Sequence, residues 1–319
     1  MQKEKPMYSI VIPVYNEEEN IANLHQEIKG VCEKEKYNYE VIIIDDGSTD
    51  KTSSIAKKLF PSINIQLRRN FGQTAAIDCG IKKSQGEYII ILDGDGQNDP
   101  ADIPNLINYL ECNDLDVVSG WRRNRKDKLS KIMVSRIAKI MRNIIIRDGL
   151  NDSGCSLKIY RSECFEGITL FGEMHRFIPA VLKIKGFRIG ELEVNHRPRV
   201  YGRTKYGWKR SMKGFIDMIS VWFWYKYAVR PLHLLGGYGI FSIVLGIITA
   251  GVGLWFYVMG ITLFRFFLPI LSAFLLLSGI QVFLIGLIAD MLSKNYFETS
   301  KNTPYSIRST FENKSSNTK

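Results

Sequence analysis

The N-terminal two thirds of the chain alternate short apolar runs with segments whose apolar residues recur at helical spacing. Near-continuous apolar runs predict four buried strands, within residues 8–16, 39–48, 63–70 and 87–96. The segments between these strands predict three helices, within residues 17–36, 49–60 and 72–85. Unbroken apolar strands that alternate with helices indicate a mostly parallel sheet covered on both faces. We therefore expect an α/β domain over residues 1–205.

Two later segments, 232–260 and 266–289, contain no Asp, Glu, Lys or Arg. Each exceeds the roughly 20 residues that a helix needs to cross a bilayer; a pair of buried core helices is the alternative. Lys and Arg crowd before the first segment and after the second, so the positive-inside rule predicts that both termini and the α/β domain are cytoplasmic. Basic and aromatic residues mix between the domain and the first span, as is typical of amphipathic helices in the headgroup layer. The predicted divisions are the α/β domain, juxtamembrane helices (206–230), a two-helix transmembrane hairpin (231–292) and a cytoplasmic tail (293–319).

The chain carries 43 basic and 32 acidic residues, a net charge of +11. Such an excess predicts an anionic partner, which could be nucleic acid, a membrane surface or a phosphate-bearing ligand. The basic residues concentrate near the predicted membrane segments, so we expect a lipid bilayer and no nucleic acid. Five scattered cysteines show no CxxC or His-paired metal spacing, which favours reduced thiols over a disulfide framework. The N-terminal residues lack an apolar core segment, so no signal peptide is expected.

Acidic residues follow two of the predicted strands: Asp45-Asp46 and Asp93-Gly94-Asp95. In a parallel sheet the carboxyl ends of the strands meet at one edge, where ligands bind. Carboxylates so close together repel one another, and each loses hydration beside a buried strand. A cation is therefore expected beside them.

Four motifs occur in order: "IPVYNEEENI", "IIIDDGSTDKT", "LDGDGQNDP" and "RPRVYGRTKYGW". With them the chain resembles family 2 of the glycosyltransferases, which have a Rossmann-like GT-A fold. Within that family it is similar to the polyprenyl-phosphate glycosyltransferases, the group that includes dolichyl-phosphate mannose synthases. The resemblance covers nearly the whole chain once the paired apolar segments are included. It implies direct, inverting transfer of one sugar from a nucleotide-sugar donor to a polyprenyl phosphate, for cell-envelope glycosylation at the cytoplasmic face of the plasma membrane.

The resemblance also implies roles for the motif residues. The metal segment would bind Mg²⁺ or Mn²⁺, ions that prefer oxygen ligands, through Asp93, Asp95 and Gln97. The nucleotide sugar would be held by Pro13, Tyr15, Glu17, Asp45, Asp93, Arg203 and Lys205. For the first loop and Asp46, a strand-end turn and helix cap is the alternative reading. For Arg203 and Lys205, a basic loop beside the membrane is the alternative.

The lipid phosphate would contact Arg122, Ser135 and Arg136, since arginine suits bidentate phosphate contacts. A solvated basic face against anionic lipid is the alternative for this segment. Some relatives carry an acidic residue directly after the glycine of a "TGD" stretch, where this chain has Cys155. Asp152 is the expected active-site carboxylate, with any strict general-base role in doubt. The expected catalytic set is Asp95, Arg122, Arg136 and Asp152.

The sequence leaves the sugar and the base open; a UDP-linked hexose or N-acetylhexosamine is favoured over GDP-mannose, whose use by a mannose synthase is the alternative. A non-catalytic, membrane-anchored nucleotide-sugar binding protein is a second alternative. A processive polysaccharide synthase would carry a QxxRW motif, which this chain lacks. Relatives suggest a homo-oligomer, a tetramer.

Overall fold

The computed structural model describes residues 5–123, 149–170, 172–198, 222–223, 226–227, 230–260 and 266–299. The chain divides into two compact units, Met1–Val221 and Trp222–Lys319. Most of the predicted juxtamembrane helices and residues 300–319 of the predicted tail lie outside the described residues, as do Ser135, Arg136, Arg203 and Lys205.

The first unit is built on a seven-stranded sheet in the order β3-β2-β1-β4-β6-β5-β7. Its strands are β1 Tyr8–Val14, β2 Tyr39–Asp45, β3 Ile63–Gln66, β4 Tyr88–Ile91, β5 Val117–Trp121, β6 Lys158–Arg161 and β7 Ile189–Glu193. The first four strands are parallel, as the apolar runs predict, and β5 and β7 pair in parallel. Strand β6 lies antiparallel between β4 and β5, so the sheet is mixed.

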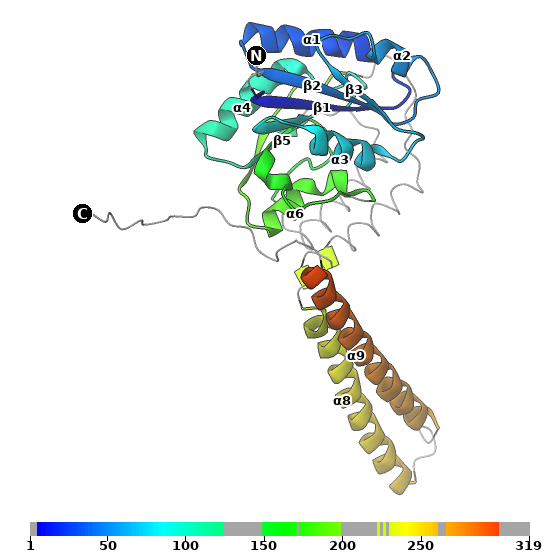
Figure 1. Cartoon of the computed structure of the whole chain (residues 1–319). Coiled ribbons are helices and arrows are strands. Elements are labelled where there is room, and N and C mark those ends of the chain that lie inside the picture. The colour runs from blue at the N-terminus through cyan, green and yellow to red at the C-terminus, as the bar shows by residue number, and fades with distance from the viewer. Residues whose placement is uncertain are drawn as a thin grey trace, which may run out of the picture. The chain divides into compact units, whose positions relative to one another are not determined.

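Helices cover both faces of the sheet (Figure 1). They are α1 Ile21–Lys34, α2 Thr52–Ala56, α3 Gln73–Lys83, α4 Ile103–Cys112 and α6 Ile178–Ile184, with short 3₁₀ turns η1 Pro100–Asp102, η2 Ser162–Phe165 and η3 Met174–Arg176. One face of α1 is buried because its apolar residues recur at helical spacing, and together with α4 it packs on the β1 side chains Ile10 and Ile12. Helix α3 packs on the opposite face of β1 and β2.

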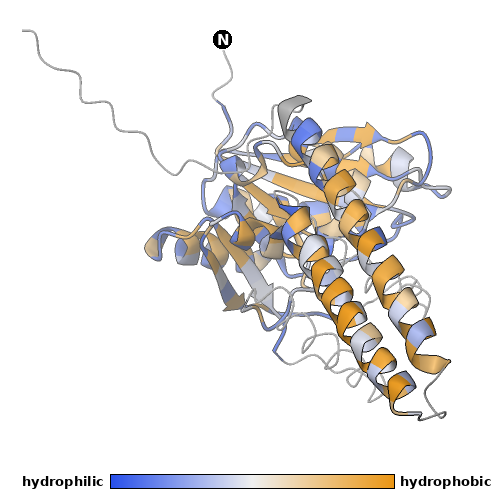
Figure 2. Cartoon of the chain, turned by 90° about the horizontal axis from the view of Figure 1, so that it is seen from below, coloured by the Kyte–Doolittle hydropathy of each residue, from blue (hydrophilic) through white to orange (hydrophobic). Residues whose placement is uncertain are grey.

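The second unit consists of helices α8 Pro231–Val258 and α9 Phe267–Thr299. Each is long and apolar enough to cross a membrane, and apolar colour runs along both in Figure 2. Small residues let the helices approach closely: a Cβ added to Gly239 or Gly279 would meet the opposing backbone at 2.8 Å. The Ser272 hydroxyl donates to the Gly246 carbonyl at 2.9 Å, which links the helices within their apolar interface.

Candidate active site

The strand register gathers polar side chains at the carboxyl edge of the sheet. Asp45 at the end of β2 lies opposite Val14 of β1 and Gln66 of β3. On the other side of β1, strand β4 ends at Ile91 and leads into the loop that carries Asp93. The two acidic motifs therefore follow strands that flank β1, as expected for carboxyl ends at a common edge.

Asp93 is held by side chains from two other segments. Gln73, the first residue of α3, donates from Nε2 to Asp93 Oδ1 at 2.6 Å. The Ser156 hydroxyl also bonds to Asp93, and accepts a bond from Asn98 at 2.7 Å. Burial and the neighbouring charge of Asp95 raise the pKa of Asp93 to about 6, against the opposing effect of the Ser156 bond.

Asp95 and Gln97 complete an oxygen-rich loop. Asp95 is 9% exposed and its Oδ1 accepts a bond from the Gln97 backbone at 3.2 Å. Among the described residues no three acidic, His or Cys side chains form a closed metal cage. Two close carboxylates and an amide oxygen fit a hard divalent cation that takes its other ligands from a substrate and water. Burial and the neighbouring charge of Asp95 both disfavour the ionised form of Asp93, so a bound cation would stabilise it.

Arg122 and Asp152 form a bidentate ion pair near the same edge. Arg122 directly follows β5, and its Nε and Nη2 donate to the two Asp152 oxygens at 2.7 and 3.0 Å. The Arg122 backbone N–H adds a third bond at 3.2 Å. Burial acts to raise the pKa of Asp152, but the bonds and charge of Arg122 outweigh it and hold that pKa below its ordinary value. Arg122 keeps three further N–H groups that this pair does not use.

Lys158 is a buried cation between these groups. Its Nζ donates to the carbonyl oxygens of Ser153 and Cys155, in the turn that follows Asp152. Burial lowers the pKa of Lys158, whereas the charges of Asp152 and Asp93 act to raise it. Lys158 therefore fixes the turn that follows Asp152, and it interacts electrostatically with both Asp152 and Asp93.

The first loop and the loop after β2 are interlocked. The Glu17 backbone donates to Thr52 Oγ1 at 2.8 Å, and Asn16 Oδ1 accepts from the Thr49 backbone at 2.8 Å. Pro13 lies in β1, and Tyr15 and Glu17 follow it in this loop, so both lie beside the end of β2. The Asp45 side chain is 3% exposed at the same place.

Asp46 has a structural role. Its two oxygens accept bonds from the Phe71 and Gly72 backbones at 2.8 and 2.9 Å, which positions the start of α3. Gly47 has a φ of +68°, and a Cβ there would lie 2.4 Å from the Arg69 carbonyl carbon, so this contact requires glycine. Arg69 and Phe71 are thereby brought to the site edge, with the guanidinium 4.5 Å from the ring centroid.

The fold brings several further side chains to the site that no motif in the sequence had identified. Gln73 and Thr74 begin α3; Thr74 Oγ1 lies 2.7 Å from His175 Nδ1. Gln73 could have been suspected because it is a polar residue directly after Gly72, where a helix is predicted to begin. Lys158 could have been suspected because a charged residue interrupts the otherwise largely apolar run "SLKIY".

A mixed, mostly parallel sheet with a DxD loop at its carboxyl edge is the arrangement expected of a GT-A glycosyltransferase. The model of the family "Glycosyl transferase family 2" matches residues 9–169. A dodecaprenyl-phosphate galacturonate synthase from Rhizobium johnstonii is 36% identical over 316 residues, which cover 96% of this chain and 94% of that protein. The chain therefore belongs to glycosyltransferase family 2.

A second relative supports this assignment, and a solved structure shares the fold. An undecaprenyl-phosphate 4-deoxy-4-formamido-L-arabinose transferase from Aeromonas hydrophila is 30% identical over 318 residues, 94% of this chain and 93% of that protein. A crystal structure of glucosyl-3-phosphoglycerate synthase from Mycobacterium tuberculosis with Mn²⁺ and UDP-glucose has a TM-score of 0.55 at 16% identity, covering 68% of this chain and 79% of that chain. The predicted GT-A fold class is confirmed.

Proposed function

We propose that this protein transfers one sugar from a nucleotide-sugar donor to a polyprenyl phosphate at the cytoplasmic face of the plasma membrane, with inversion at the anomeric carbon. The observation that carries the proposal is the placement of the Asp93–Asp95 loop and the Arg122–Asp152 pair around the same strand ends, linked through Ser156 and Lys158. Two relatives that match along nearly the whole chain are named as polyprenyl-phosphate enzymes.

The donor would lie along the carboxyl edge. Pro13, Tyr15, Glu17 and Asp45 would hold the nucleotide, while Arg203 and Lys205 would contact its diphosphate. Mg²⁺ or Mn²⁺, held by Asp93, Asp95 and Gln97, would neutralise the diphosphate as it leaves. Because Gln73 and Ser156 already bond to Asp93, they would keep this carboxylate in place as the donor binds.

The acceptor phosphate would bind to the open N–H groups of Arg122, with Ser135 and Arg136 as further contacts. A phosphomonoester has a second pKa near 6 and is largely a dianion at neutral pH. The nucleophile therefore needs little help from a base, and the work of the protein is to align and neutralise two anionic substrates. Asp152, held by Arg122 with a lowered pKa, would orient that arginine.

The paired apolar helices would anchor the enzyme as two transmembrane spans, with both termini cytoplasmic. Cytoplasmic placement gives access to soluble nucleotide sugars. We further propose a homo-oligomer, as a tetramer. The donor is proposed to be a UDP-hexose or UDP-N-acetylhexosamine.

The test is a transfer assay on the purified full-length protein. Radiolabelled UDP-hexoses, UDP-N-acetylhexosamines and GDP-mannose are each incubated with undecaprenyl phosphate and Mn²⁺, and label in the lipid extract is counted. We expect one UDP-sugar to label the lipid and its anomeric configuration to invert. Transfer from GDP-mannose instead would make the protein a mannose synthase. Tight donor binding without lipid labelling would favour a non-catalytic binding protein.

A further inference from the structure

Helix α9 has a face that packs against α8 and an opposite face that does not. Small residues recur every seven positions along the first face and are buried in the helix pair: Ser272, Gly279, Gly286 and Ser293. Gln281 follows Gly279 by two residues, which places it about 200° further around the helix. Gln281 therefore points away from α8, and it is exposed.

Gln281 belongs to a row of residues on that opposite face, which we call the outer stripe. Its members recur at alternating intervals of three and four residues, and all are exposed: Phe274, Leu277, Gln281, Leu284, Ile288 and Met291. This repeat of large apolar residues is the pattern with which parallel helices pack in a left-handed coiled coil. A single polar residue in such a row fixes the register and the number of helices that associate.

The uncharged part of α9 contains three polar side chains. Its two serines donate to backbone carbonyls within the helix pair: Ser272 to Gly246, and Ser278 to Leu275. Gln281 is the third, and its side-chain amide forms no hydrogen bond with the described residues. The hydrocarbon of a bilayer offers an amide no partner, so an open amide is costly there.

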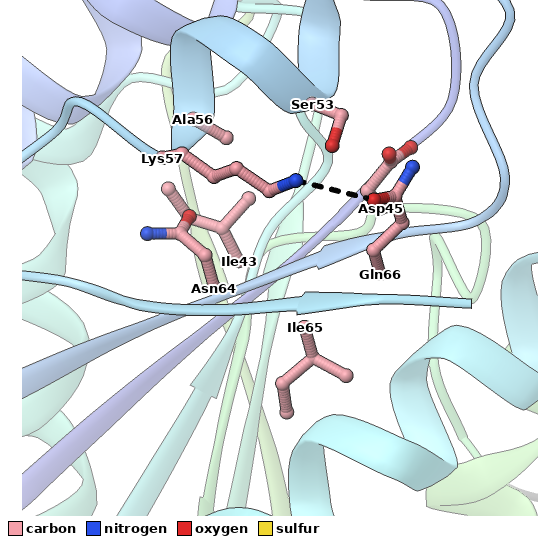
Figure 3. Close-up of a pocket in the computed structure, with 8 residues that line it drawn as sticks. All are labelled: Ile43, Asp45, Ser53, Ala56, Lys57, Asn64, Ile65 and Gln66. Atoms are coloured by element: carbon pink, nitrogen blue, oxygen red, sulfur yellow. Dashed lines mark hydrogen bonds between the residues drawn. The ribbon is translucent and has the colours of Figure 1, made fainter.

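Water can satisfy an open polar group in the first unit, but it cannot reach Gln281. Asp45 Oδ2 and Asn64 Oδ1 are buried without a partner among the described residues, yet both side chains line a small cleft between α2 and the strands β2 and β3 (Figure 3). That cleft has room for about one water molecule. Gln281 instead lies about 14 Å along the helix from Asp290, the first charged residue after the apolar segment. From that depth its side chain is too short to reach the headgroup layer.

A second copy of the chain is the partner that fits this surface. A primary amide both donates and accepts, so two Gln281 side chains related by a two-fold axis can exchange two hydrogen bonds. Two copies in one membrane have the same orientation, so their α9 helices are parallel and each position of the outer stripe meets its own counterpart. The apolar members of the stripe then pack around the amide pair. A lipid tail would cover those apolar residues but leave the amide open.

We propose that two copies of the protein associate within the membrane through the outer stripe of α9, with their Gln281 side chains bonded to one another. This inference rests on the proposed function, because it assumes that α9 crosses the membrane. It assigns a surface to the proposed homo-oligomer; a tetramer would need a second interface elsewhere in the chain.

Disulfide cross-linking in native membranes tests the surface. The full-length protein is made without its native cysteines and carries either Leu277→Cys or Leu284→Cys, with Gln281 kept. Oxidation should convert most of each variant to a covalent dimer. Phe241→Cys is the matched control and should give little dimer, because Phe241 occupies the equivalent place on α8, two residues after Gly239, and is also exposed.

Substitution of Gln281 tests the amide pair. Gln281→Leu keeps the stripe apolar but removes both hydrogen bonds, so the apparent dissociation constant should rise roughly tenfold. Gln281→Asn keeps an amide and should lie between Gln281→Leu and wild type. Phe241→Leu should leave association unchanged. The dissociation constant is measured by energy transfer between labelled full-length copies in detergent micelles.

Several results would overturn this interface. They are no cross-link at either position of the stripe, equal cross-linking from Phe241→Cys, a cross-link from the stripe to a protein of another size, or unchanged association of Gln281→Leu. Each would leave membrane anchoring and sugar transfer intact. Release of the wild-type protein from membranes by alkaline carbonate would instead overturn the proposed spans, and this interface with them.

Discussion

Replacing Asp152 with asparagine separates two roles for this carboxylate. Asp152→Asn keeps the size of the side chain and one oxygen acceptor, but removes the charge that neutralises Arg122. The side chains of Arg122 and Asp152 are only 11% and 16% exposed, and two bonds of 2.7 and 3.0 Å join them. Losing one partner of such a buried pair costs about 3–5 kcal/mol. Since asparagine retains one bond, we expect about 3 kcal/mol, or a fall in Tm of about 6–12 °C.

The effect on activity distinguishes orientation from base catalysis. Removing a general base typically costs about 10²–10⁴-fold in kcat. If Asp152 only orients Arg122, the loss should instead appear as a roughly tenfold rise in the KM for polyprenyl phosphate, with a small change in kcat. The acid limb of the pH–rate profile should persist in Asp152→Asn, because it reports the acceptor phosphate, whose second pKa is near 6.

The assay follows labelled sugar entering undecaprenyl phosphate in detergent micelles, with saturating donor, across a pH series. Glu193→Gln is the matched control: the Arg123–Glu193 pair is exposed and 3.5 Å long, so its loss should change stability by less than about 1 kcal/mol. A thousandfold fall in kcat at unchanged acceptor KM, together with disappearance of the acid limb, would refute the orienting role and make Asp152 the base.

Three further predictions concern the metal loop and the membrane. Asp95→Asn should keep the fold but reduce turnover by orders of magnitude, and EDTA should inactivate wild type reversibly; full activity in both would exclude the metal assignment. The pKa of Asp93, raised to about 6 in the metal-free protein, favours folding at low pH, and this contribution is lost as pH rises from about 4 through 6. Asp93→Asn should therefore stabilise metal-free protein above pH 7 by up to ~3 kcal/mol but not near pH 4, as thermal melts would show. In intact cells that express the protein without its native cysteines, Gly260→Cys should react with a membrane-impermeant thiol reagent. Ser300→Cys should react only after the membrane is permeabilised, and its labelling in intact cells would contradict a cytoplasmic tail.

The local pattern of apolar residues correctly predicted the four parallel strands β1 to β4. The apolar runs of β1 and β2 and the helical spacing in α1 depend on residues close in sequence, so periodicity reveals them. The insertion of β6 between β4 and β5 did not follow from any such pattern. Its pairing joins Ile90 to Ile159, which are far apart in sequence, and a four-residue strand carries no signal for its neighbours or its direction.

The same distinction holds within the site. The acidic motifs are contiguous, so the sequence exposed Asp45, Asp93 and Asp95 as candidates. The partners that fix them come from elsewhere in the chain: Gln73 reaches Asp93 only because α3 begins beside the end of β4. A sequence also cannot reveal that one oxygen of Asp45 has no hydrogen-bond partner among the described residues, because that depends on which backbone groups the folded loop presents.

The charges at the carboxyl edge of the sheet support the proposed cation site and a role for the basic segment that follows β5. Among the described residues, Asp93 and Asp152 both interact with two buried basic side chains, Arg122 and Lys158. A donor diphosphate and an acceptor phosphate would each add negative charge to a site that is already short of positive charge. A divalent ion would offset part of this negative charge at the donor. We expect the rest to be offset by residues 123–147, which hold nine Lys and Arg against Asp127 alone. Because repulsion between the two phosphates is greatest as they approach, we expect these basic residues to assist binding of the acceptor.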